Sequence, residues 1–252
     1  MRRWFFVIPI LFLLVACAGG SKGAKKDKAV LIEEHFQAGY SAAVRGNLAE
    51  ATSEYQAVLK LDPNHLRAHL NLGTVYGKDG KFSKEIAEYE KAIKIDPTSA
   101  DAYFNMAVAY YEKTDLDKAM VYYKKALQVN PNFFEARNNL GSIYFRRGKL
   151  EEALSEYQKA ITIHPDYARG HFNIGNVYLQ REEWDEAIES FKRTLAIDPK
   201  HVAAHYHLAW AYYKKREYPL AIEHADQAGK LGMIVDPRFL EQLKPHRKEK
   251  TS

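Results

Sequence analysis

The amino-acid sequence predicts an all-α fold in which six similar pairs of helices stack in chain order. The first observation is an asparagine that recurs every 34 residues, at Asn71, Asn105, Asn139 and Asn173. The second is a series of prolines at the same interval, each within a short polar step such as LDPN around Pro63. A self-similar period of this length is typical of stacked repeats, and proline disfavours a helical conformation in the residue before it. Each unit of 34 residues therefore contains two helices and ends in a proline loop.

The first residues predict a signal peptide with a lipid attachment site. Two arginines precede an apolar run from Trp4 to Ala16, which is shorter than the roughly 20 residues of a transmembrane helix. The stretch Leu14-Val15-Ala16-Cys17 resembles the lipobox of bacterial lipoproteins, which implies that residues 1–16 are removed and that Cys17 is lipidated. The resemblance implies several acyl chains, as stable anchoring requires. Because Ala18 follows the cysteine, we expect the outer membrane, facing the periplasm. The alternative is a plain secretory peptide that contains a cysteine.

Composition and charge limit the functions that remain. Residues 17–31 are rich in Gly and Lys without periodicity, which predicts a flexible tether. The net charge of +5 includes basic residues at both ends, and without them residues 29–243 carry −3. A nucleic-acid binder would show a basic stripe on its fold, so we expect no nucleic-acid partner. Cys17 is the only cysteine, so no disulfide or thiolate metal site is expected.

The repeat columns predict how the helices pack. Gly46, Gly80 and Gly148 lie midway through their units and predict tight turns between the two helices. An aromatic column in the second helices is expected to be core, and comprises Tyr55, Tyr89, Tyr123, Tyr157 and Phe191. A column of small residues in the first helices would let the two helices approach closely, and comprises Gly39, Gly73, Ala107, Gly141, Gly175 and Ala209. The predicted repeats are 32–65, 66–99, 100–133, 134–167, 168–201 and 202–235.

These columns, with a tyrosine series at Tyr76, Tyr110, Tyr144, Tyr178 and Tyr212, closely resemble the tetratricopeptide repeat (TPR). The resemblance covers residues 32–235 and implies a superhelical solenoid whose first helices line the concave side. The sixth repeat is the least regular, as expected of a terminal repeat. Residues 236–252 are expected to form a short capping helix, about 237–244, and a basic tail, with Leu240 and Leu243 covering the last repeat.

The asparagine series is the strongest candidate for a binding site. It extends to Gln37 in the first repeat and His207 in the sixth. On a helical wheel of the third repeat, Asn105 lies opposite the face that packs on the second helix. An amide matches the donor and acceptor of an extended peptide unit, and aromatic neighbours would add apolar contact. The predicted groove residues are Gln37, Asn71, Asn105, Asn139, Asn173, His207, Phe36, Phe104, Tyr111, Asn138, Phe145, Phe172, Asn176, Tyr206, Trp210 and Tyr213. The alternative is that asparagine belongs to the generic repeat pattern and is merely solvated.

No sequence motif predicts catalysis. There is no Gly-rich phosphate loop, no Gly-x-Ser-x-Gly and no His-Glu-x-x-His. The spacing of His201, His205 and His207 is compatible with Zn²⁺, but His205 shares a repeat column with other histidines, which packing explains more simply. We therefore expect no catalytic residue, no metal site, no cofactor and no small-molecule substrate.

The sequence thus predicts a membrane-anchored TPR scaffold of the bacterial envelope. It would bind an extended segment or a helix of an envelope protein in its groove and support assembly of an envelope complex. One alternative is a pilotin for type IV pilus secretin assembly, to which the chain is similar in architecture alone. Another is an adaptor for peptidoglycan hydrolases or other envelope enzymes. A catalytic role is disfavoured because the segment after Lys244 is too short to hold a catalytic domain.

Overall fold

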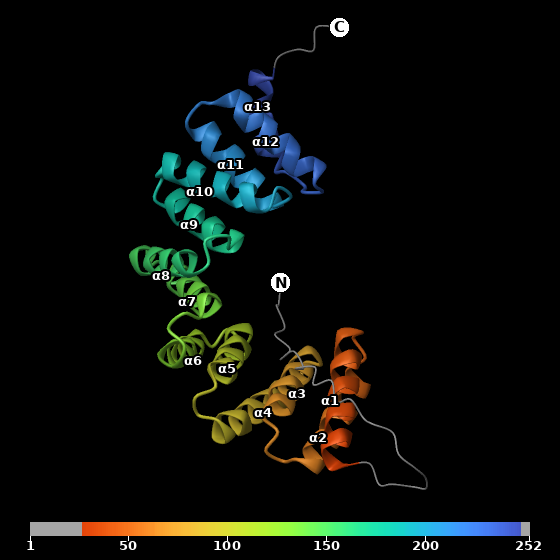
Figure 1. The fold of residues 1–252 in the computed structure, drawn as a ribbon. Coiled ribbons are helices and arrows are strands. Elements are labelled where there is room, and N and C mark those ends of the chain that lie inside the picture. The colour runs from red at the N-terminus through yellow and green to blue at the C-terminus, as the bar shows by residue number, and fades with distance from the viewer. Residues whose placement is uncertain (1–26, 248–252) are drawn as a thin grey trace. The chain divides into compact units, whose positions relative to one another are not determined.

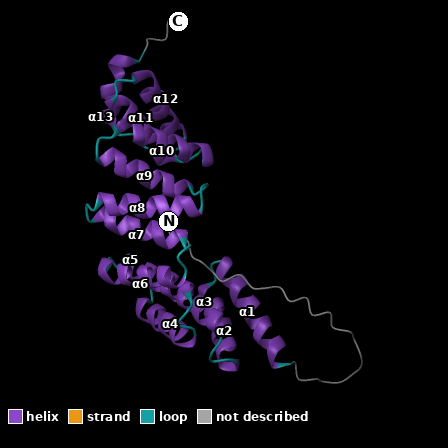
Figure 2. Cartoon of the chain, turned by 60° about the vertical axis from the view of Figure 1, so that its left-hand side comes forward, coloured by secondary structure: helices purple, strands orange, loops and turns teal. Residues whose placement is uncertain are grey.

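The structure is a computed structural model that describes residues 27–247, and within them the fold is all-α (Figure 1). The chain divides into two compact units, Met1–Pro131 and Asn132–Ser252. Figure 2 shows the described residues as helices joined by short loops. The predicted signal peptide, the lipobox, Cys17 and the end of the basic tail lie outside the described residues. No helix among residues 27–247 is both long enough and apolar enough to cross a bilayer.

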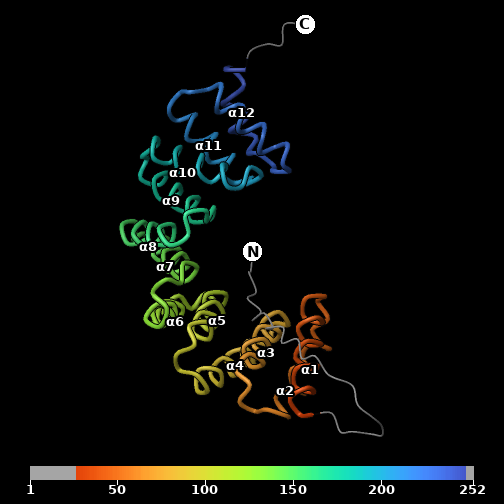
Figure 3. The backbone as a smooth tube through the Cα atoms, in the orientation of Figure 1, coloured from red at the N-terminus to blue at the C-terminus, as the bar shows by residue number. Residues whose placement is uncertain are grey.

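The first unit contains three helix pairs. They are α1 (Lys28–Val44) with α2 (Leu48–Leu61), α3 (Leu66–Lys78) with α4 (Phe82–Ile95), and α5 (Ala100–Glu112) with α6 (Leu116–Val129). Each helix contacts the next one along the chain, and the first helices of neighbouring pairs also touch, α1 with α3 and α3 with α5. The first unit is therefore a stack of three repeats in chain order, as the trace in Figure 3 shows.

The second unit contains three further pairs and a short terminal segment. The pairs are α7 (Phe134–Arg146) with α8 (Leu150–Ile163), α9 (Ala168–Gln180) with α10 (Trp184–Ile197), and α11 (Val202–Lys214) with α12 (Tyr218–Lys230). They are followed by α13 (Pro237–Leu243) and a 3₁₀ turn, η1 (Lys244–His246). The helices again contact their neighbours in order, and α13 packs against α12. The prediction of about six helix-turn-helix repeats with a short C-terminal helix is confirmed.

The start of the first repeat differs from the prediction. Residues 28–31 belong to α1 rather than to the tether, so the helix begins four residues before the predicted boundary at 32. The cause is Asp27, whose carboxylate accepts a hydrogen bond from the backbone N–H of Ala29 at 3.2 Å and caps the helix. The Lys-rich composition of this stretch concealed the cap.

Close approach of the paired helices explains the small residues in the first helices. A Cβ atom added to Gly73 would lie 2.5 Å from Cε1 of Tyr89. Tyr89 is 2% exposed, and the rest of its aromatic column is buried to the same degree. In the four repeats that have glycine at this position, the aromatic ring of the same repeat fills the space that the glycine leaves open.

The turns between paired helices share one backbone conformation, although three of them contain glycine and three do not. Gly46, Gly80 and Gly148 have φ between 71° and 81°, in the left-handed region. Thr114, Glu182 and Arg216 occupy the same repeat position in the other three units and have φ between 59° and 63°. The glycine turns are confirmed, and the fold imposes the same turn where the sequence has no glycine.

The terminal helix caps the last repeat with a different residue from the one predicted. Phe239 is 2% exposed and Leu243 is fully buried, whereas Leu240 is 36% exposed. Residues four apart lie on the same side of a helix, so Phe239 and Leu243 form the buried face together. The expectation that Leu240 covers the last repeat is therefore wrong.

Candidate functional site

The predicted groove residues in the first unit are mostly enclosed in the packing. Asn71 is fully buried, and its Nδ2 donates to the hydroxyl of Tyr55 in the preceding repeat at 3.2 Å. Asn105 is 7% exposed. Gln37 is half-buried, and its Nε2 donates to Oε1 of Glu33, one turn earlier on α1, at 2.6 Å. In this unit Asn71 joins two neighbouring repeats, and neither Asn71 nor Asn105 lies open to solvent.

Two predicted aromatic contacts are also part of the core. Phe36 and Phe104 are 1% and 2% exposed, and each lies 5.7 Å, ring to ring, from the core tyrosine of its own repeat. Asn138 in the second unit is 1% exposed. As they stand, Phe36, Phe104, Asn71, Asn105 and Asn138 present little or no contact surface, which corrects the expectation that they line an open groove. The half-buried members of the predicted set are Gln37, Tyr111, Asn139, Phe145, Asn173, Phe172, Asn176, Tyr206, His207, Trp210 and Tyr213.

In the second unit, hydrogen bonds link the candidate amides across neighbouring repeats. Asn173 donates to Oδ1 of Asn138 at 2.8 Å, and Asn138 donates to Oδ1 of Asn139 at 3.5 Å. One repeat further, Nδ1 of His207 lies 2.7 Å from Oδ1 of Asn176. All of these side chains except Asn138 are half-buried. The arrangement fixes the orientation of each side chain before any partner arrives.

Aromatic rings surround the C-terminal part of this polar series. Phe172 stacks on His207 with the ring centres 5.3 Å apart. Tyr206 and Trp210 lie on the same helix, α11, and their ring centres are 6.0 Å and 5.2 Å from that of Phe239 on α13. The sequence prediction placed Tyr206, Trp210 and Tyr213 in the groove, and the structure shows that Phe239 covers part of this aromatic surface. The repeat pattern did not predict Phe239, because it lies beyond the last complete repeat.

Burial keeps His207 neutral. Desolvation, with a smaller contribution from His201, lowers the pKa of His207 to about 4. Desolvation has the opposite effect on the phenol of Tyr55, which accepts from the buried Asn71, and raises its pKa. Both groups therefore act as neutral hydrogen-bonding partners at neutral pH.

Three further polar pairs, each containing at least one histidine, join the two helices of a repeat. Nδ1 of His69 lies 2.6 Å from Oε2 of Glu88, and His35 is paired with Glu54 at the same distance. Burial opposes ionisation of Glu88, but hydrogen bonds from His69 and Lys91 outweigh it and lower the pKa of the carboxyl. In the last repeat, His205 and His224 occupy the positions equivalent to His69 and Glu88, and their Nδ1 atoms lie 3.0 Å apart.

The three histidines whose spacing is compatible with Zn²⁺ each have a different hydrogen-bond partner. His201 accepts the backbone N–H of Ala204 at 3.1 Å and caps α11, His205 pairs with His224, and His207 pairs with Asn176. Within residues 27–247 no group of three or more His, Cys, Asp or Glu side chains is arranged to hold a metal ion.

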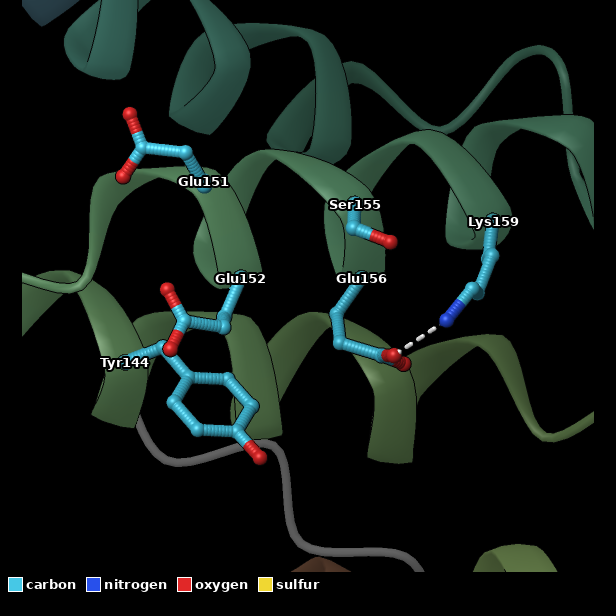
Figure 4. A pocket seen from close by; sticks show the side chains of 6 residues that line it. All are labelled: Tyr144, Glu151, Glu152, Ser155, Glu156 and Lys159. Carbon is cyan, nitrogen blue, oxygen red and sulfur yellow. Dashed lines mark hydrogen bonds and ion pairs between the residues drawn. The ribbon is translucent and has the colours of Figure 1, made fainter.

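The sequence reasoning missed two surface pockets. One, of about 370 Å³ in the second unit, is lined by Tyr144, Glu151, Glu152, Ser155, Glu156 and Lys159 (Figure 4). In this pocket Glu156 forms ion pairs with Arg137 at 3.1 Å and with Lys159 at 2.6 Å. The other, of about 450 Å³, lies between α2, α3 and α4 and includes Lys91 and Lys94. Acids and lysines one turn apart were the only sequence signal, and such spacing is common on solvated helix faces.

Known proteins share this repeat and this fold. A family model described as TPR repeat matches residues 42–80, 79–114, 141–181 and 175–215, more than half of the chain. Models described as tetratricopeptide repeat match residues 100–133 and 122–155. No curated protein matches the chain.

Three solved structures illustrate the likeness. MamA is 28% identical, with a TM-score of 0.57 over 68% of this chain and 94% of its own. Pseudomonas aeruginosa PilF is 18% identical, with a TM-score of 0.77 over 85% of this chain and 99% of its own. YrrB, described as a TPR protein with an unusual peptide-binding site, is 21% identical, with a TM-score of 0.60 over 76% and 97%. At these identities the likeness to PilF and YrrB shows the fold alone.

The family matches, the 34-residue register and the stacked helix pairs agree with one another. Proteins built from these repeats bind peptide segments of partner proteins and are typically non-catalytic scaffolds. The chain belongs to the tetratricopeptide repeat family.

Proposed function

We propose that this protein is a lipid-anchored scaffold of the bacterial envelope that holds an extended segment or a helix of another envelope protein against the first helices of its repeats. It would not be an enzyme. The observation that carries the proposal is the set of half-buried polar and aromatic side chains on α7, α9 and α11, because hydrogen bonds already orient them.

The chemistry of this surface suits a polypeptide partner. Amides supply donors and acceptors that match peptide units of any sequence, and rings such as Trp210 supply apolar contact. A hydrogen bond contributes about 0.5–1.5 kcal/mol net, so several together with apolar burial support micromolar affinity. YrrB, a TPR protein with an unusual peptide-binding site, supports the same use of the fold.

The membrane location rests on the N-terminal sequence. The pattern Leu14-Val15-Ala16-Cys17 supports lipidation at Cys17, with outer-membrane retention because Ala18 follows. A tether that ends near Lys28 would keep the repeats close to the membrane surface. The pilotin alternative and the hydrolase-adaptor alternative share this anchor and differ only in the partner.

The proposal is tested by crosslinked pull-down from membranes with an Asn139→Ala/Asn173→Ala double variant. The control is Gln128→Ala/Gln158→Ala, which removes two exposed amides from second helices. We expect the first variant to lose partners that the wild type and the control retain. An identical partner list for all three proteins would show that these amides are not part of the binding surface. Recovery of a secretin would favour the pilotin alternative, and recovery of wall hydrolases would favour the adaptor.

A further inference from the structure

One member of the amide series is an imidazole. His207 on α11 occupies the repeat position that holds asparagine in the four preceding units. Its ring stacks on Phe172 at 5.3 Å and meets the edge of Phe191 at 5.5 Å. Nδ1 points to Oδ1 of Asn176 on α9, 2.7 Å away. Two aromatic contacts and one hydrogen bond thus hold the ring.

The hydrogen bond to Asn176 determines which nitrogen carries the proton. A carboxamide oxygen only accepts, so Nδ1 of His207 must donate. In a neutral imidazole the other nitrogen is then an acceptor. The pKa of His207, lowered to about 4 by burial and by His201, keeps the ring neutral at neutral pH. Nε2 therefore has a lone pair and no proton.

The free nitrogen is open to the surface. Nε2 of His207 makes no hydrogen bond to another described residue, and the side chain is half-buried. If this nitrogen were fully enclosed, it would be a buried atom without a hydrogen-bond partner, and within residues 27–247 it is not one. Nε2 is thus a pre-oriented acceptor beside the rings of Phe172 and Tyr206.

We propose that His207 is a specificity-determining residue of the binding surface, selecting a partner segment that presents an N–H or O–H donor at the last repeat. This inference rests on the proposed function, since it assumes that a polypeptide lies along the first helices. An asparagine at this position would accept or donate, whereas His207 in this tautomer accepts only. A partner carbonyl or carboxylate at Nε2 would face a lone pair and be rejected.

The tautomer is tested without any partner. Nitrogen-15 NMR of the lipid-free chain should show His207 protonated at Nδ1 and titrating well below the ordinary histidine range. Asn176→Asp should raise the pKa of His207 well above its wild-type value, because a carboxylate favours the imidazolium. His201 is the other titratable group that acts on this ring. A proton on Nε2, or a wild-type pKa near 6.5, would overturn the inference and leave the proposed function standing.

Selection is tested with fluorescent peptides taken from a random phage-displayed library on the wild-type chain. His207→Phe keeps the ring contacts but removes the acceptor, and should weaken binding about 3- to 10-fold. His207→Asn restores an acceptor and should bind within about 2-fold of wild type. His171→Phe, on the other side of α9, is the control for adding a phenyl ring.

The pH dependence separates this role from simple packing. Wild-type affinity should stay constant from about pH 8 to about pH 5.5, because the ring does not titrate there. In Asn176→Asp, affinity should fall as the pH drops through the raised pKa, since Nε2 then carries a proton. Unchanged binding by His207→Phe would overturn the inference alone. Failure of every library peptide to bind, with the tautomer as expected, would overturn the proposed function as well.

Discussion

At the scale of single residues, side chains in the same repeat column differ in how deeply they are buried. Asn71 and Asn173 share one column, yet the first is fully buried against Tyr55 and the second is half-buried against Asn138. A periodic pattern identifies equivalent positions but not how tightly neighbours close over them. The same holds for turns, because Glu182 adopts the left-handed conformation that Gly148 adopts one repeat earlier.

Glycine at residue 182 should stabilise the protein. Glu182 has φ of 59°, a conformation that costs an L-residue about 1–2 kcal/mol, whereas glycine adopts it freely. Glycine loses more entropy on folding, so the expected net gain for Glu182→Gly is about 0.5–1 kcal/mol, measured by urea unfolding. The matched control, Gly148→Ala, should destabilise by about 1 kcal/mol. A loss of stability in Glu182→Gly would show that the glutamate has a stabilising contact greater than its backbone strain.

At the scale of helices, the sequence predicted the pairing well and the ends less well. The columns of proline, glycine and tyrosine recur along the stack, where three to five copies reinforce one signal. Lys28 and Phe239 lie at the two ends, where no neighbouring copy exists for comparison. The candidate surface was predicted only in part for a different reason, since hydrogen bonds such as that between Asn176 and His207 depend on side-chain orientation and not on period.

The pair that joins α11 to α12 should make the last repeat sensitive to acid. His205 and His224 place two nitrogens 3.0 Å apart, and burial with the neighbouring His205 lowers the pKa of His224. Lys192 adds to this effect and Glu223 opposes it. Above pH 6.5 His224 is neutral in the folded and the unfolded chain, so it has no effect on stability. As the pH falls below 6.5, the unfolded chain binds the proton first and stability decreases.

His224→Glu tests this reasoning, because it recreates the His–Glu pair that His69 and Glu88 form in the second repeat. We expect wild type to lose about 1 kcal/mol more than this variant between about pH 7 and about pH 5, measured by thermal unfolding. His35→Gln is the control for a histidine in a different repeat. Parallel losses in wild type and His224→Glu would contradict the assignment. Stabilisation of wild type by added Zn²⁺ would show that the pair binds metal instead.

At the scale of the whole molecule, the proposed protein consists of a lipid anchor and a stack of repeats. The described helices bury their own apolar columns without any partner, so the repeats should fold independently of the lipid. Cys17→Ser is therefore expected to leave the circular dichroism spectrum and the melting temperature unchanged while moving the protein from the membrane fraction to the soluble fraction. Continued membrane association of this variant would contradict lipid anchoring at Cys17.

The most direct test of the central claim is site-specific photo-crosslinking in cells. A photoreactive residue is placed at Asn173, on the proposed binding surface, and in a second protein at Gln158, on the exposed face of α8. We expect a crosslinked polypeptide partner from position 173 and none from position 158. Equal crosslinking from both positions, or crosslinking from 158 alone, would contradict the claim that the first helices hold the partner.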